Sequence, residues 1–223
     1  MRIALFGGTF DPIHSGHLRA ARAAARKFRL DRILFVPSGN PPHKAEDGLT
    51  PFSRRYAMVV LATTGDPRFF PSLLEEPATD GRLRYSIDTV RAARRQLSTN
   101  DEMFFLLGAD AFRDLPHWKD FRRLLDATHF IVASRPGYSI GQLAGTLPSG
   151  LEVRPEPRQR PTALRLRRTT IHILPGLDIA ISSRQIRETI RKGGRVAGLV
   201  PRLVEEYILK EGLYRPAPRG PRK

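Results

Sequence analysis

Apolar runs alternate with amphipathic segments along this chain, beginning at its first residues. Residues 3–6 (IALF) form a run typical of a buried strand, and this run ends at Gly7 and Gly8. From about Gly16 the sequence predicts a helix whose apolar face carries Leu18, Ala21, Ala25 and Phe28. A second apolar run follows at residues 32–36 (RILFV). Strand, helix and strand in this order favour a right-handed crossover between parallel strands.

The alternation continues beyond the second strand. Further strands are expected within 67–74 and at 103–107, 130–133 and 171–174. The run at 103–107 (MFFLL) is the most apolar, so we expect it at the centre of the sheet. Further helices are expected from Thr50 as N-cap and Pro51 as first residue, from Ser86 as cap, from Ser182 or Ser183, and over 202–210. Residues 139–169 show no period and predict a long surface excursion or a partly disordered segment.

These elements predict an α/β fold with a doubly wound, mostly parallel sheet and a short helical C-terminal part. At 223 residues, one domain over 1–214 is the default, with 181–214 helical and 215–223 a basic, flexible tail. The chain has no cysteine, which excludes disulfides and thiolate metal sites and fits a cytoplasmic protein. No membrane partner is expected, because no apolar run could span a bilayer and no signal-peptide pattern is present.

The formal net charge of +16 raises the question of a nucleic-acid partner. Much of the excess lies on expected helix faces, in 154–168 and in 215–223. These arginines are not interleaved with aromatic residues, as a platform for single-stranded nucleic acid requires. We therefore interpret the excess as solvated surface, with attraction for anionic substrates and no specific nucleic acid. The same interpretation admits a homo-oligomer.

Two histidines lie where the first strand gives way to the first helix. His14 and His17 flank Gly16 in the segment GGTFDPIHSGH. Unpaired N–H groups and the positive end of the helix dipole meet at a helix start, which favours a bound phosphate. Histidines there can also be plain polar caps, and H-x-G-H alone does not separate the two interpretations. The complete segment directly after a strand favours phosphate binding.

More polar side chains follow the ends of other strands, at the edge of the sheet where ligands bind in such folds. Lys44 lies in a proline-rich loop, Asp110 follows the most apolar strand, and Trp118 could stack on a heteroaromatic ring. A second helix start carries Ser182, Ser183 and Arg187. These residues also have ordinary structural interpretations: Lys44 as a solvated side chain, Asp110 and the serines as helix caps, and Trp118 as part of the core.

The candidate residues favour transfer of a phosphoryl-type group without a covalent intermediate. No nucleophile–base pair, no carboxylate cluster for two metals and no G-x-x-x-x-G-K-[ST] loop is present. A zinc site at His14 and His17 lacks a third protein ligand, so no metal ligands are assigned. Cations and N–H donors suit in-line attack of one phosphate on another. Mg²⁺ bridging triphosphate oxygens would require little from the protein.

Eight motifs together resemble the bacterial nicotinate-nucleotide adenylyltransferases, within the H-x-G-H nucleotidyltransferase superfamily. In chain order they are GGTFDPIHSGH, NPPHK, YSIDT, GADAF, LPHW, ASRPGY, ISSRQIR and EGLYR. The resemblance implies a Rossmann-like nucleotidyltransferase fold and a late reaction of NAD synthesis. ATP and nicotinate mononucleotide would give deamido-NAD and pyrophosphate, with Mg²⁺ accompanying ATP.

The resemblance also implies roles for individual residues. The catalytic residues would be His14, His17, Lys44 and Arg187. ATP would be bound by Gly7, Gly8, Thr9, Phe10, Gly16, Gly108, Asp110, Ser182 and Ser183. Nicotinate mononucleotide would be bound by Asn40, Ser86, Trp118 and Arg135, with its carboxylate at backbone N–H groups around Ser86 and Trp118.

Two features depart from the family pattern, and two other functions stay open. Arg184 replaces a small or hydroxylated residue, and the arginine-rich stretch 154–168 resembles an insertion. A sister enzyme could adenylylate nicotinamide mononucleotide or phosphopantetheine instead, although the length and the LPHW and YSIDT segments disfavour the latter. From another class, a nucleotide-binding or RNA-binding protein without catalysis would also use such a basic chain.

Overall fold

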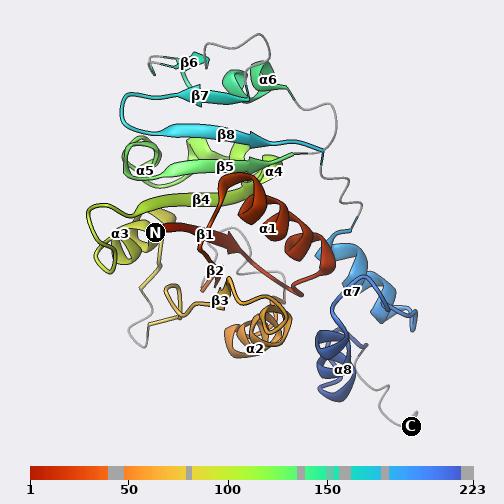
Figure 1. The fold of residues 1–223 in the computed structure, drawn as a ribbon. Coiled ribbons are helices and arrows are strands. Elements are labelled where there is room, and N and C mark those ends of the chain that lie inside the picture. Colours follow the sequence, from red (N-terminus) through yellow and green to blue (C-terminus); the bar gives the residue numbers. More distant parts are fainter. Residues whose placement is uncertain are drawn as a thin grey trace, which may run out of the picture.

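A computed structural model describes residues 1–39, 48–78, 82–134, 139–149, 151, 153–155, 162–176 and 181–216. These residues form one eight-stranded sheet in the order β3-β2-β1-β4-β5-β8-β7-β6 (Figure 1). The strands are β1 (Arg2–Gly8), β2 (Arg32–Pro37), β3 (Phe69–Pro71), β4 (Glu102–Gly108), β5 (His129–Ala133), β6 (Arg154–Pro155), β7 (Ala163–Arg165) and β8 (Thr170–Leu174). Neighbouring strands along β3-β2-β1-β4-β5-β8 pair in parallel. Strand β7 pairs antiparallel with β8, and β6 pairs antiparallel with β7. The predicted doubly wound, mostly parallel sheet is confirmed.

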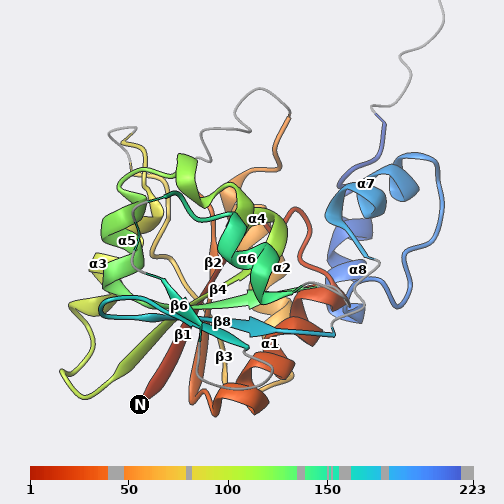
Figure 2. The ribbon, with the colours of Figure 1, turned by 90° about the horizontal axis from the view of Figure 1, so that it is seen from above.

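Helices cover both faces of this sheet, as Figure 2 shows from above. They are α1 (Ser15–Phe28), α2 (Phe52–Thr63), α3 (Ser86–Arg94), α4 (Ala109–Arg113), the 3₁₀ turn η1 (Leu115–His117), α5 (Phe121–Ala127), α6 (Ile140–Gly145), α7 (Ser183–Arg191) and α8 (Arg202–Lys210). Apolar residues of α1, α2, α7 and α8 join one core cluster, and those of α3 to α6 join the other.

The central strands supply both clusters because successive side chains of a strand point to opposite faces. In β4, Phe104 and Leu106 belong to the α1 side, whereas Met103, Phe105 and Leu107 belong to the α3 side. All five are buried. This is why the run 103–107 reads as continuously apolar, and its predicted central position between β1 and β5 is confirmed.

The starts of α1, α2, α3, α7 and α8, which were predicted, agree with the structure to within one residue. Ser182 is the N-cap of α7, and its side chain accepts from the Gln185 backbone N–H at 3.2 Å, as predicted. Two predicted caps were wrong: Pro51, not Thr50, is the N-cap of α2, and Tyr85, not Ser86, is the N-cap of α3. Neither Pro51 nor Tyr85 makes a side-chain capping bond, so the cap rule had no signal to follow there.

The prediction for residues 139–169 was wrong where the structure describes them. Helix α6 and strands β6 and β7 lie in this stretch, and β7 extends the sheet by pairing with β8. Leu164 of β7 is buried in the second cluster. Elements of two to six residues are too short to show a period, and the partner strand fixes them instead.

The last two helices lie beyond the carboxyl ends of the strands, near the start of α1 (Figure 1). Ile186, Ile190, Val204 and Ile208 are buried in the cluster that α1 also joins. They give the fold the helical C-terminal part that was predicted. Most of the predicted tail, residues 217–223, lies outside the described residues. Over the part of the chain that is described, no helix combines the length and apolar character needed to cross a membrane.

Candidate active site

The turn between β1 and α1 brings the first strand close to two aromatic rings. A Cβ on Gly7 would lie 3.2 Å from the Phe105 ring, and one on Gly8 would lie 3.0 Å from the Phe10 ring. A side chain at either position would therefore fit only if the neighbouring ring moved slightly. Phe10 itself has a positive φ of 50° and is buried, so the turn folds back over the end of the strand.

The His14 and His17 rings stack at this turn, with centroids 3.7 Å apart. His14 is the N-cap of α1, and its backbone N–H donates to His17 Nδ1 at 3.2 Å. Because Nδ1 of His17 is an acceptor, the proton of its neutral ring is on Nε2. Phe6 and Phe10 stand edge-on to His17, with centroids 5.9 Å and 5.0 Å away.

Both imidazoles are neutral at pH 7 in the free protein. Burial, and then the charge of Arg19, lower the pKa of His14 to about 4. Burial and the stacked His14 ring hold the pKa of His17 well below its usual range. His14 Nδ1 is buried and has no hydrogen-bond partner among the described residues. A buried polar atom of this kind requires an explanation, and a ligand that pairs with it is one.

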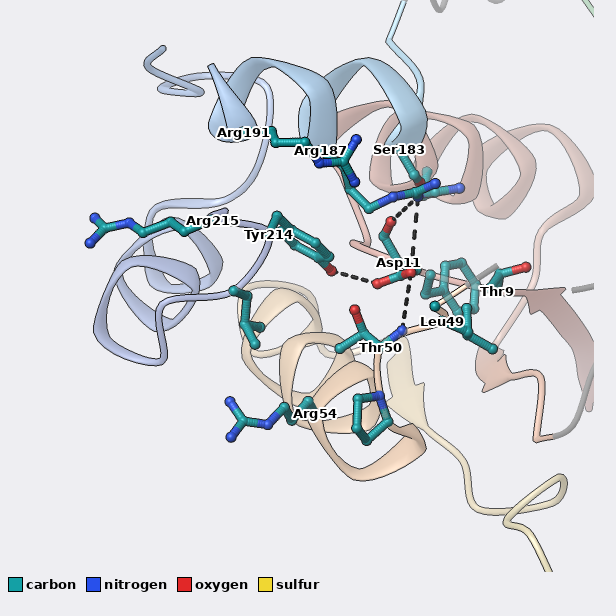
Figure 3. Close-up of a pocket in the computed structure, with 15 residues that line it drawn as sticks. Thr9, Asp11, Leu49, Thr50, Arg54, Ser183, Arg187, Arg191, Tyr214 and Arg215 are labelled. Carbon is teal, nitrogen blue, oxygen red and sulfur yellow. Dashed lines mark hydrogen bonds and ion pairs between the residues drawn. The ribbon is translucent and has the colours of Figure 1, made fainter. Parts of the chain in front are cut away.

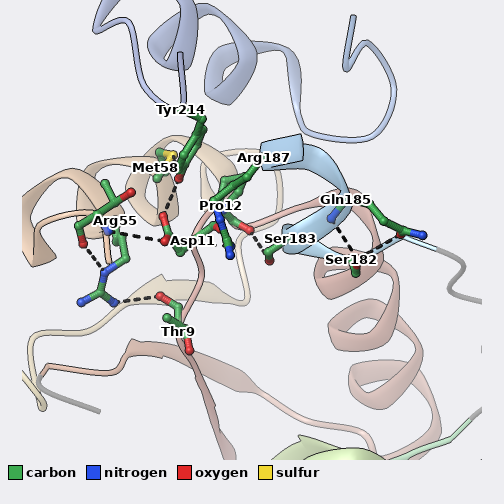
Figure 4. Close-up of polar contacts among 11 residues, drawn as sticks. Thr9, Asp11, Pro12, Arg55, Met58, Ser182, Ser183, Gln185, Arg187 and Tyr214 are labelled. Carbon is green, nitrogen blue, oxygen red and sulfur yellow. Dashed lines mark hydrogen bonds and ion pairs between the residues drawn. The ribbon is translucent and has the colours of Figure 1, made fainter. Parts of the chain in front are cut away.

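The start of α7 contacts the same turn, as Figure 4 shows. Ser183 donates its hydroxyl hydrogen to the Pro12 carbonyl at 2.9 Å, and Arg187 Nη1 donates to the Asp11 carbonyl at 2.6 Å. The starts of α1 and α7 therefore lie at one location, and phosphate binding there stays a prediction. Ser182 adds its cap at the same end of α7.

A buried carboxylate, Asp11, links the turn to two more segments (Figure 3). Tyr214 donates its phenol hydrogen to Oδ1 at 2.6 Å, and the Thr50 backbone N–H approaches Oδ2 at 3.4 Å. Arg187 Nη1 lies 4.0 Å from Oδ2. Burial and the Asp11 charge raise the pKa of the Tyr214 phenol, which therefore stays protonated and donates.

Arg55 fixes the turn from the side of α2. Its side chain is 1% exposed, and it donates to the carbonyls of Thr9 and Thr50 at 2.8 Å each and of Gly39 at 3.3 Å. Sequence reasoning assigned no role to Arg55, Asp11 or Tyr214. Asp11 and Tyr214 lie inside the motifs GGTFDPIHSGH and EGLYR, and this position could have indicated that they contribute to the site. No motif marked Arg55.

A first cavity of about 600 Å³ opens beside these groups. It is lined by Thr9, Phe10, His17, Ser183 and Arg187, all predicted to act on ATP. Three further arginines also line it: Arg54, Arg191 and Arg215. A cavity with this many cations is suited to a highly charged anion such as a triphosphate.

A second cavity of about 510 Å³ lies on the other side of the turn. Gly7, Gly8, Thr9, Ser86 and Trp118 are among its lining residues. Thr9 lines both cavities, so they share a wall residue directly after the end of β1. The arrangement offers two neighbouring spaces for ligands on either side of this residue.

The remaining predicted residues are placed less centrally, or lie outside the description. Asp110 is 79% exposed, pairs with Arg113 and does not line either of the two cavities described. Gly108 is exposed at the end of β4, and Gly16 is buried in α1. Arg184 points to solvent and pairs with Glu188 at 3.1 Å. Asn40, Lys44 and Arg135 lie outside the described residues.

Comparisons with known proteins agree on one family. Residues 5–189 match the cytidylyltransferase-like family. A probable nicotinate-nucleotide adenylyltransferase of Moorella thermoacetica is 41% identical, over 96% of this chain and 92% of the relative. One of Thermus thermophilus is 42% identical, over 96% of this chain and all of the relative. The chain belongs to the nicotinate-nucleotide adenylyltransferase family.

Solved structures share the fold of this adenylyltransferase. The Plasmodium falciparum nicotinic acid mononucleotide adenylyltransferase complexed with NaAD has a TM-score of 0.70 to it, with 18% identity over 96% of this chain and 97% of that one. A putative nicotinate-nucleotide adenylyltransferase from Vibrio parahaemolyticus has a TM-score of 0.63 with 17% identity. These neighbours confirm the predicted nucleotidyltransferase fold.

Proposed function

We propose that this chain transfers the adenylyl group of ATP to nicotinate mononucleotide, giving deamido-NAD and pyrophosphate in NAD biosynthesis. The observation that carries the proposal is that a cationic cavity and a cavity beside Trp118 share the wall residue Thr9. The cationic cavity suits the triphosphate, and the cavity beside Trp118 suits a flat ring. The curated relatives of this family bear the name of the same reaction.

The transfer is a direct in-line displacement without a covalent intermediate. A phosphate oxygen of nicotinate mononucleotide attacks the α-phosphorus of ATP, and the bond from that phosphorus to the bridging oxygen of the β-phosphate breaks. The electron pair of that bond leaves with pyrophosphate. The protein contributes positioning and charge stabilisation, which dominate catalysis of this type.

Residues of the first cavity, and residues beside it at the starts of α1 and α7, act on the phosphates. His17 donates its Nε2 hydrogen to a phosphate oxygen. His14 supplies the second imidazole of the site, and its Nδ1, which has no partner among the described residues, pairs with the bound substrate. Arg187, with Ser182 and Ser183 at the start of α7, stabilises the departing pyrophosphate. Arg187 Nη1 already bonds the Asp11 carbonyl, and its other N–H groups are directed to phosphate. Lys44 assists from its loop.

The remaining nucleotide contacts are assigned from the family resemblance. Thr9 and Phe10, which line the first cavity, contact ATP, with Gly7 and Gly8 of the second cavity and Gly16 at the start of α1 beside the nucleotide. Gly108 ends β4 and Asp110 follows it, where a carboxylate can accept from ribose hydroxyls once Asp110 leaves Arg113. Nicotinate mononucleotide stacks near Trp118, meets backbone N–H groups around Ser86, and is contacted by Asn40 and Arg135.

Mg²⁺ is the proposed cofactor and enters with ATP. Among the described residues, no group of three or more His, Asp or Glu side chains could hold a metal ion. The Asp11 carboxylate already accepts from Tyr214. This donor set fits a cation held mainly by substrate phosphates and water. When bound, Mg²⁺ neutralises charge on the triphosphate.

The absence of cysteine suits a cytoplasmic location for the enzyme.

A panel of acceptors tests the proposal. Pyrophosphate release is measured with ATP, Mg²⁺ and, in turn, nicotinate mononucleotide, nicotinamide mononucleotide and phosphopantetheine. We expect the highest kcat/KM with nicotinate mononucleotide. Faster turnover of phosphopantetheine would assign the chain to a sister activity. ATP binding without turnover of any acceptor would leave a nucleotide-binding module instead.

A further inference from the structure

Two cations line the second cavity next to Ser86 and Trp118. Arg84 precedes α3 and Lys119 follows η1, and both line this cavity. Lys119 Nζ lies 4.2 Å from the centroid of the Tyr85 ring, and Arg84 Nε donates to the Glu76 carbonyl at 3.1 Å. Each cation is therefore held at the cavity by a contact of its own.

The described lining of this cavity includes one carboxyl group against these two cations. That group is Glu75, which is buried and accepts from the Thr89 hydroxyl at 2.7 Å. Burial raises the pKa of Glu75 above its usual range, which favours its neutral form. Even when ionised, Glu75 offsets only one of the two positive charges. The start of α3 adds the positive end of its dipole at Ser86. The charged side chains that line this end of the cavity therefore sum to a positive charge.

We propose that Arg84 and Lys119 are specificity-determining residues that make the cavity prefer a pyridine ring bearing a carboxylate over one bearing a neutral carboxamide. The inference rests on the proposed function and names how the acceptor is chosen. Backbone N–H groups can select the acid by hydrogen-bond direction, whereas these side chains select it by charge. A charge effect is reduced by salt, and a difference in hydrogen-bond direction is affected far less.

The size of the effect is moderate, because both side chains are exposed to solvent. Coulomb attraction over several ångströms at a solvated site corresponds to about three- to tenfold per charge in an equilibrium constant. Removing both charges is therefore expected to lower the preference more than either single change. Replacing each cation by the other basic residue retains the charge and most of the preference.

The test compares Arg84→Met, Lys119→Met and the double variant with Arg84→Lys and Lys119→Arg. The matched control is Arg122→Met, which removes an exposed charge outside this cavity. The quantity measured is the ratio of kcat/KM for nicotinate mononucleotide to that for nicotinamide mononucleotide, at low and high KCl. Thermal unfolding of each variant checks that it folds.

We expect the ratio to fall about three- to tenfold for each methionine variant. The ratio should fall further in the double variant and stay unchanged in the control. Salt should lower the ratio of the wild type but not that of the double variant. An unchanged ratio in a folded, active double variant would overturn the inference.

The same comparison is possible without turnover. If the wild type used neither acceptor, the proposed function would fail, and calorimetric binding of the two mononucleotides would give the ratio. A wild-type preference for the acid that the double variant loses would support the inference. Equal binding of acid and amide by the wild type would overturn it.

Discussion

His17 presents one defined donor to the first cavity, because its other ring nitrogen is already used. Nδ1 accepts from the His14 backbone N–H, which leaves the hydrogen on Nε2. The ring is also fixed by the His14 stack and two phenylalanine edges. A donor held in this way does not need to reorganise as negative charge develops on the phosphate.

Replacing His17 by alanine is therefore expected to lower kcat by about 10²- to 10³-fold, the usual loss for one preorganised donor. Steady-state pyrophosphate release measures the effect. Circular dichroism and thermal unfolding serve as controls for the fold. His17→Asn keeps a short hydrogen-bond donor and should retain more activity than the alanine variant. Equal kcat for wild type and His17→Ala would remove His17 from the mechanism.

His14 makes stability depend on pH in a defined window. An unfolded histidine titrates near 6.5, whereas the pKa of His14 in the fold is about 4. Between these values the unfolded state binds a proton that the folded state does not. The free energy of unfolding should therefore decrease as the pH falls through this window, by about 3 kcal/mol if His14 acts alone.

Urea unfolding of wild type and His14→Gln between pH 7 and pH 4 measures this contribution. The variant should show the shallower dependence, because it lacks the titrating ring. His17 and His129 have lowered pKa values as well and add the same sign in both proteins. The difference between the two curves gives the contribution of His14, including its effect on the pKa of His17. Parallel curves would show that the fold does not lower the pKa of His14.

Arg54 and Arg55 are neighbours with opposite surroundings. Arg55 is buried and bonds three carbonyls, whereas the Arg54 side chain is 39% exposed and pairs with Glu211 at 2.7 Å. Arg55→Met should lower the free energy of unfolding by about 3 kcal/mol, because it leaves buried carbonyls without donors. Arg54→Met is the matched control, with an expected loss of about 0–1 kcal/mol. Urea unfolding measures both, and equal losses would contradict the expectation.

At the scale of elements, the segment after α8 supports the turn before α1. Tyr214 reaches Asp11 across 203 positions of sequence. Ser15 adds two bonds to the segment before α8, from its N–H to the Leu199 carbonyl at 2.8 Å and from its hydroxyl to the Gly198 carbonyl at 3.0 Å. The helical C-terminal part is thus bonded directly to the loop that carries the two histidines.

Tyr214→Phe removes one hydroxyl and keeps the ring. We expect a loss of about 1–2 kcal/mol in the free energy of unfolding, since the buried Asp11 carboxylate loses a donor. A several-fold rise in KM for ATP should accompany it, because the turn and Arg187 are then less well fixed. Tyr207→Phe, on the α8 helix, is the control for loss of a tyrosine hydroxyl. A stability loss without any kinetic change would limit Tyr214 to a purely structural role.

Helices and strands long enough to show a hydrophobic period were predictable from the sequence. Short elements whose position depends on pairing with a neighbouring strand were not. Strand β1 and helix α1 follow from the runs at 3–6 and after Gly16, and the starts of α1 and α7 follow from glycines, histidines and serines. Strand β7 depends on pairing with β8, which no local pattern encodes. Asp11, Arg55 and Tyr214 act through contacts between distant segments. Chain order alone does not give such contacts.

At the scale of the whole molecule, the charge of +16 and two anionic substrates favour rapid encounter. The first cavity is lined by four arginines, Arg54, Arg187, Arg191 and Arg215, so the attraction is directed to the site. Raising KCl from about 0.02 to about 0.5 M should lower kcat/KM for ATP several-fold, because salt screens exposed charges. Stopped-time assays at constant Mg²⁺ measure this, with sucrose as a control for viscosity. A flat salt profile would show that the net charge does not assist binding.

The bond from Tyr214 to Asp11 has a consequence for synthesis of the chain. Asp11, in the turn before α1, is synthesised 203 positions before Tyr214, which supports it. A nascent polypeptide that stalls before residue 214 would carry both imidazoles and bind substrates poorly. Competence is thereby delayed until Tyr214 has been synthesised and has reached Asp11.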